Sequence, residues 1–170
     1  MEKLNDEYSV RTKVLYGLGG ALAHFPDGIR QFNEAGGWNK LRNCVDDVDE
    51  GYECQRRVAF FLAHYLAEDG VQSTKEIEEN MFMEGFVNII ENENHSNEAD
   101  LLEKVPERSL RIRLIQMIQV VSMLVTKRIG TSNQVTMTKL KNLLPFLKSR
   151  HPDSLDQASW ETLENTLKSL

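Results

Sequence analysis

The residues able to do chemistry are scattered along this 170-residue sequence, and their spacing decides what they can do. The four histidines are His24, His64, His95 and His151, and none lies near other metal-ligating residues at ligand spacing. No HExxH pair, glycine-rich phosphate loop or GxSxG nucleophile turn is present. We therefore expect no catalytic residue, no cofactor and no metal, and a protein that is not an enzyme.

Two acidic clusters invite a metal-binding interpretation but lack the rest of such a site. The run Asp46–Glu50 resembles a fragment of a calcium loop, yet it has neither the glycine nor the distal glutamate of one. The run Glu76–Glu79 is a carboxylate cluster typical of the solvated face of a helix. We interpret the first as a polar loop and the second as helix surface.

Two further features bear on the compartment of the protein. Asn94, His95 and Ser96 form a possible glycosylation sequon, within a polar stretch, Glu91–Asp100, that we expect to be an enlarged loop. Cys44 and Cys54 do not form a CxxC pair or a zinc motif. Two thiols and a disulfide, which would suit an oxidising compartment, both remain open for them.

The overall composition is that of a globular domain with an acidic surface. The net charge is −6, with 41% hydrophobic and 27% charged residues. Nucleic acids and anionic membranes need clustered positive charge, so neither is an expected partner. The most apolar segment, Ile112–Val125, contains Arg113, Gln116 and Gln119, so no membrane span is expected.

Helix boundaries can be read from proline and glycine. A first helix is expected over Val10–His24, with its glycines, among them Gly17, in close helix contacts that offset their low helix propensity. Pro26 ends it and opens a second helix. Gly36 and Gly37 then end that helix as a left-handed C-cap does, and a third helix begins.

The order of short and long helices recurs along the chain. The segment 57–66 aligns without a gap on 13–22, 44 residues earlier, and Ile77 aligns on Ile29, 48 residues earlier. The segment 113–118 occupies the same positions in a third long helix. A period in the forties, with two short helices and one long one, indicates an armadillo or HEAT-type α-solenoid.

We therefore predict a single all-α, armadillo-like domain over 1–170. It comprises a first repeat region (10–48), a second (52–90), a third long helix (100–130) and a C-terminal helical cap (136–170). Inward positions of the cap are expected at Leu140, Leu143, Leu144, Leu147, Leu155, Trp160, Leu163 and Leu167. Nothing comparable caps the N-terminal end, so we expect earlier repeats in a longer protein.

The long helices of an armadillo stack line its concave groove, where partners bind. If Val14, Leu18 and Leu22 face the core, helical phase places other positions in the groove. These are Lys13, Tyr16 and Gly20 in the first copy, Arg57, Phe60 and His64 in the second, and Arg113, Gln116 and Val120 in the third. Arginine and aromatic side chains are common interface anchors. Alternatively, Tyr16 and Phe60 are core residues between repeats, and His64 is a structural histidine.

The punctuation of the first repeat resembles a known family. The segments Val10–Leu18, His24–Pro26, Arg30–Phe32 and Gly36–Trp38 are similar to the middle of the armadillo-type nucleotide exchange factors of 70 kDa heat-shock chaperones. The series HFP, RQF and GG is most similar to the endoplasmic-reticulum branch, which acts on BiP. The VRTK start is equally similar to the fungal cytosolic branch.

This resemblance implies a function and a partner. Members of the family grip the ATPase domain of the chaperone with their concave face, and ADP leaves the opened nucleotide cleft. We accordingly expect a monomeric co-chaperone in the endoplasmic reticulum lumen, with the cytoplasm as the alternative. The rival hypothesis is a generic armadillo scaffold that binds a peptide or another protein in the same groove.

Overall fold

The protein is helical throughout the residues that its structure describes. This computed structural model describes residues 13–15, 17–18, 22, 25–46, 51–67, 74–95 and 107–170, and no strand occurs among them. Residues 13–15, 17–18 and 22 are helical. The elements that follow are α2 (Pro26–Glu34), α3 (Gly37–Asp46), α4 (Gly51–Ala67), α5 (Thr74–Glu79), α6 (Phe82–His95), α8 (Glu107–Thr126), α9 (Gln134–Arg150), the 3₁₀ turn η1 (Pro152–Ser154) and α10 (Gln157–Ser169).

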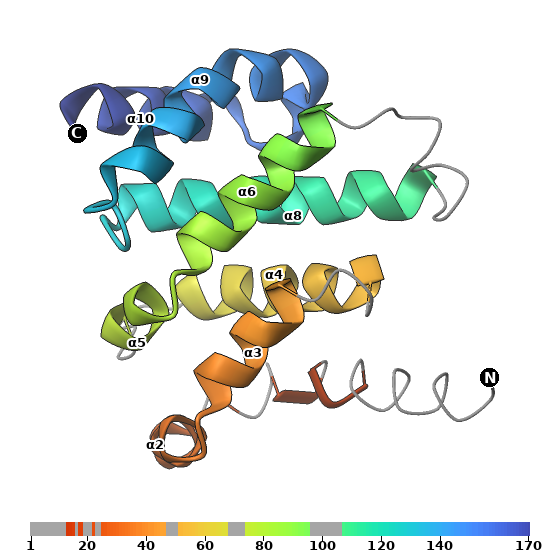
Figure 1. Ribbon diagram of the computed structural model, residues 1–170, viewed down its shortest axis with the longest axis vertical. Helices are drawn as coiled ribbons and strands as arrows, with labels where there is room; N and C mark the ends of the chain where they lie inside the picture. Colours follow the sequence, from red (N-terminus) through yellow and green to blue (C-terminus); the bar gives the residue numbers. More distant parts are fainter. Residues whose placement is uncertain are drawn as a thin grey trace.

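The helices are arranged as an all-α solenoid, in two layers. The long helices α4 and α8 lie side by side, and α10 packs against α8 (Figure 1). In the other layer α3 packs on α4, α6 on α8, and α9 on α6. The described part of the chain repeats one order, with α2, α3 and α4 followed by α5, α6 and α8. The predicted fold class is confirmed, whereas the number of repeats stays a prediction.

The turn between α2 and α3 follows the chemistry of its residues. Pro26 lies in the first turn of α2, where its missing N–H costs nothing. Gly36 has φ +65°, and its N–H donates to the carbonyl oxygen of Asn33 at 2.9 Å. A β-carbon on Gly37 would overlap the ring of Phe32, so α3 can start this close to α2 only with glycine there. The prediction of a left-handed C-cap is confirmed.

Trp38 is the centre of an aromatic cluster that joins four helices. Its ring centroid lies 5.1 Å from that of Phe32 on α2, 5.4 Å from Tyr65 on α4 and 6.4 Å from Phe82 on α6. The indole N–H donates to Asn33 Oδ1 at 2.5 Å, so the buried polar atom is satisfied. This cluster fixes α4, which carries the candidate surface described below, against both neighbouring short helices.

The C-terminal part folds as its apolar spacing predicts. Asn133 caps α9, because its side-chain oxygen accepts from the N–H groups of Val135 and Thr136, both at 3.1 Å. All but two of the predicted inward positions are buried, and Leu144 and Leu155 are half-buried. None of the described helices combines the length and apolar character needed to cross a membrane.

Two expectations for the first helical segment are wrong. Val14 is 58% exposed instead of core-facing, although Leu15 and Leu22 are buried. Gly17 is exposed, and a β-carbon built on it would have no neighbour within 4 Å. Its small size is therefore not required by a close helix contact.

Candidate functional site

One face of α4 presents three of the residues predicted for the groove. Arg57, Phe60 and His64 follow one another at spacings of three and four residues, so they share one side of the helix. Phe60 is 37% exposed, and His64 is exposed. The two rings meet edge-on with centroids 4.3 Å apart. We call Arg57, Phe60 and His64 the α4 row. It is an aromatic surface with basic character, of the type that anchors protein interfaces.

Glu53 holds the arginine end of the α4 row. Its carboxylate lies 3.0 Å from Arg57 Nε and also pairs with Arg56. The hydrogen bond from Arg56, helped by the charges of both arginines, lowers the pKa of Glu53 against the opposing effect of burial. Glu53 is therefore ionised at neutral pH, and it restrains the half-buried side chain of Arg57 along the helix.

The structure changes the register in which α8 corresponds to α4. Every buried apolar position of α4 has a buried counterpart on α8 exactly one offset later, 59 residues along the chain, as with Cys54 and Arg113. The sequence alignment had used an offset of 56. In the observed register Arg57 corresponds to Gln116, which is half-buried on α8. The buried pairs run from 54, 58, 59, 61, 62, 65 and 66 to 113, 117, 118, 120, 121, 124 and 125.

Arg113 is in the core, so its prediction as a groove residue is wrong. The residue is 2% exposed, and its Nη1 donates to Gln55 Oε1 at 2.6 Å. It forms an ion pair with Glu93, and its guanidinium lies 4.0 Å from the ring centroid of Tyr52. Burial lowers the pKa of Arg113 to about 10, so the group is still charged at neutral pH. Val120, also predicted for the groove, is fully buried.

Arg113 and its partners form a buried polar connection between four helices. Gln55 Nε2 donates to the backbone carbonyl of Val45 at 3.0 Å, which extends the connection from α8 and α4 to α3. Glu93 brings in α6. The sequence contained a signal for this cluster, because a lone arginine within the most apolar segment needs a buried partner. It did not say which partner.

Asn94 is not on a loop. It lies half-buried in the last turn of α6, next to Glu93, so the expectation that a loop begins at Glu91 is wrong. The polar letters of this stretch hide a helical phase, since Ile90 is buried and Glu93 faces the ion pair with Arg113. Glycosylation at Asn94 stays a prediction.

On α8 the observed register points to two residues that sequence reasoning missed. Gln119 corresponds to Phe60, and its Nε2 donates to the carbonyl of Ser154 at 3.2 Å. Met123 corresponds to His64, and it lines a pocket of about 370 Å³ between α8 and α10. The C-terminal helices thus pack beside the α8 counterpart of the row, while the α4 row stays open.

The remaining predicted residues are not joined to the α4 row by a described contact. Lys13 is exposed, and Tyr16 and Gly20 lie outside the described residues. Cys44 is half-buried on α3 and Cys54 is buried on α4. Where the structure describes the chain, no group of three or more His, Cys, Asp or Glu is placed to bind a metal ion.

Comparison with known proteins connects part of this chain to a chaperone regulator. Over 60 residues it is 37% identical to the Hsp70 nucleotide exchange factor FES1 of Mycosarcoma maydis. The match covers 35% of this chain and 15% of that protein, so the two are compared over a small part of the relative's length. No protein-family model matches, and no solved structure matches. The similarity supports a relation to an Hsp70 exchange factor.

Proposed function

We propose that this protein is a co-chaperone that binds the ATPase domain of a 70 kDa heat-shock chaperone and promotes the release of ADP. The observation that supports this most is the 60-residue similarity to an Hsp70 exchange factor. The all-helical solenoid and the open α4 row supply a rigid surface for such a contact.

The proposed action needs no catalytic group in this chain. The α4 row binds the open form of the ATPase domain better than the closed form, and the population of the open form rises in proportion to that difference. ADP then leaves the opened cleft. Phe60 supplies the apolar anchor, while Arg57 and His64 supply the polar contacts beside it.

The finer choice of partner is a BiP-type chaperone in the endoplasmic reticulum lumen, and the protein acts as a monomer. The support is the series HFP, RQF and GG in the first repeat. A cytosolic chaperone is the alternative, and the experiment therefore includes both.

The test is stopped-flow release of a fluorescent ADP analogue from a BiP-type and from a cytosolic ATPase domain, with this protein in excess. We expect faster release from at least one of them. Replacing Phe60 by alanine should weaken the half-maximal concentration at least about fivefold, the effect of losing an interface residue worth 1 kcal/mol. Phe25, which is 64% exposed and outside the α4 row, provides a matched Phe25→Ala control that should act as the unmodified protein does.

The outcomes separate the alternatives. Faster release from the BiP-type domain alone supports the finer proposal, and faster release from the cytosolic domain alone replaces it. Binding without acceleration of either domain would leave a protein-binding scaffold. Equal effects of Phe60→Ala and Phe25→Ala would remove the α4 row from the proposal.

A further inference from the structure

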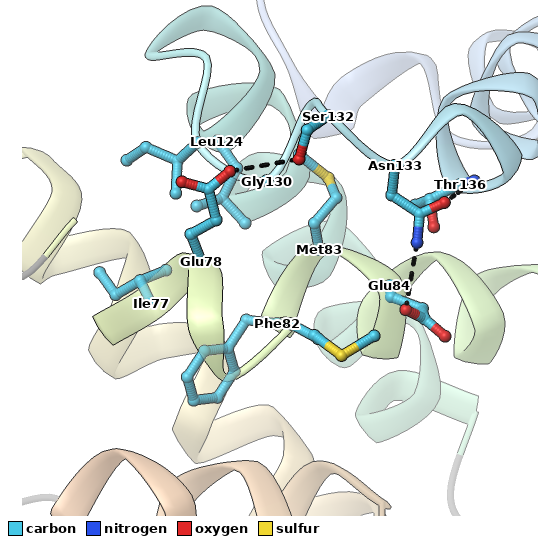
Figure 2. A pocket seen from close by; sticks show the side chains of 12 residues that line it. Ile77, Glu78, Phe82, Met83, Glu84, Leu124, Gly130, Ser132, Asn133 and Thr136 are labelled. Atoms are coloured by element: carbon cyan, nitrogen blue, oxygen red, sulfur yellow. Dashed lines mark hydrogen bonds between the residues drawn. The ribbon is translucent and has the colours of Figure 1, made fainter. Parts of the chain in front are cut away.

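A second candidate site lies on elements other than α4. A pocket of about 220 Å³ opens between the α5–α6 turn and the linker from α8 to α9 (Figure 2). Its inner wall is apolar and buried, and includes Ile77, Phe82 and Leu124. Glu78 from α5 and Glu84 from α6 bring carboxylates to it.

The linker wall of the pocket is held close to α6 by backbone geometry. Arg128 has φ +58°, and Ile129 N–H donates to the carbonyl of Leu124 at 2.8 Å, which is the Schellman ending of a helix. Gly130 has φ +70°, and a β-carbon on it would lie 3.3 Å from Met83 Cβ. This wall is therefore fixed in place.

The opposite wall turns a large apolar side chain outward. Met81 has φ +55°, and its carbonyl accepts a hydrogen bond from the guanidinium of Arg42 on α3. The same guanidinium lies 3.4 Å from the carbonyl oxygen of Asn80. Met81 lines the pocket and is 49% exposed. A flexible thioether at the rim adapts readily to an incoming side chain.

The two carboxylates have little to balance their charge. Glu78 accepts from the Ser132 hydroxyl, and Glu84 accepts from Asn133 Nδ2, each at 3.4 Å. Both hydrogen bonds are longer than the usual range. Within the described ranges neither glutamate has an ion-pair partner. Ionised carboxylates beside an apolar wall favour a cation that carries its own apolar stem.

We propose that this pocket binds a lysine or arginine side chain of a partner protein. Such a side chain lays its methylene stem along Met81 and Phe82 and places its charged head between Glu78 and Glu84. The volume is below the roughly 300–1,000 Å³ of sites for drug-sized ligands, so a side chain suits it better than a metabolite. Occupancy does not depend on the proposed chaperone contact, because α4 does not line the pocket.

The experiment uses the protein labelled with ¹³C at its methionine methyl groups. The probe is a capped pentapeptide with one arginine among four alanines, and its counterpart carries citrulline, which has a similar stem but a neutral head. The signals of Met81 and Met83, assigned by leucine substitution, report the pocket, and that of the fully buried Met117 is the internal reference. We expect saturable shifts of Met81 and Met83 with the arginine peptide and at least about threefold weaker binding of the citrulline peptide.

Matched variants test the carboxylates. Glu78→Gln and Glu84→Gln should each weaken the arginine peptide roughly twofold to fivefold, the usual range for one exposed ion pair. Glu79→Gln should not, because Glu79 lies outside the pocket and pairs with Lys75 at 3.5 Å. Absence of shifts at Met81 and Met83, or equal binding of the citrulline peptide, would overturn the proposal. Butylguanidinium binding as tightly as the peptide would show a site for small cations instead of a partner chain.

Discussion

Replacing Arg113 by methionine removes the centre of the buried polar connection while keeping a side chain of similar length. The methionine cannot donate to Gln55 or pair with Glu93, and both partners remain in the core. The Glu93 side chain is 11% exposed, so water reaches its carboxylate poorly. The variant therefore buries an unbalanced negative charge between α6 and α8.

The expected cost follows from that burial. Removing one member of a buried ion pair typically costs about 3–5 kcal/mol, because the partner is left without compensation. A domain of this kind has a total stability of about 5–15 kcal/mol, so the loss is a large fraction of it. Adding Glu93→Leu removes the stranded carboxylate, and the double variant should recover at least about 2 kcal/mol of the loss.

Urea unfolding followed by circular dichroism measures these differences in the free energy of unfolding. Arg30→Met is the matched control, since the Arg30 side chain is 63% exposed and pairs with Glu34 on the surface. That control should cost less than about 1 kcal/mol. If Arg113→Met costs no more than the control, or if Glu93→Leu destabilises Arg113→Met further, then the buried pair does not act as reasoned here.

Three further outcomes are expected from the local geometry. Gly37→Ala should destabilise by about 1–3 kcal/mol through overlap with the Phe32 ring, whereas Gly17→Ala should stabilise by up to about 1 kcal/mol; urea unfolding of the pair checks both, and equal effects would contradict the packing. Arg128→Gly should raise the stability by up to about 1 kcal/mol because φ is +58° there, and a thermal shift in either direction decides it. Burial and two nearby arginines lower the pKa of His151, so the unfolded state binds its proton first. Its contribution is complete above the unfolded pKa of about 6.5 and is lost as the pH falls from there towards the folded pKa. Loss of this pH slope in His151→Gln, with an NMR titration below 6.5 in the unmodified protein, checks it.

Much of the fold could be predicted because it depends on local chemistry. Pro26, Gly36 and Asn133 mark helix ends through their own backbone and side-chain properties, whatever surrounds them. The apolar spacing of α9 and α10 likewise identified their buried faces, because each has a polar opposite side. The exposed side of α4 was accessible to the same reasoning.

The placement of Arg113 and Asn94 was not accessible in this way. The alignment offsets of 56 and 59 differ by three residues, which turns a helix of 3.6 residues per turn by only about 60°. On α8, where apolar residues surround most of the helix, periodicity barely distinguishes two such registers. The polar end of α6 was equally ambiguous, since only its ion pair with α8 makes Glu93 a buried residue.

The sequence by itself determined that the chain is all-helical, where most of its short helices begin and end, and which face of α4 meets solvent. These features follow from backbone preferences and from periodicity within one helix. Tertiary structure alone decided that Arg113 joins the core and that a pocket forms between α5, α6 and the α8–α9 linker. Both depend on which residues from distant helices meet, and packing energy sets that meeting where the pattern of a single helix leaves it open.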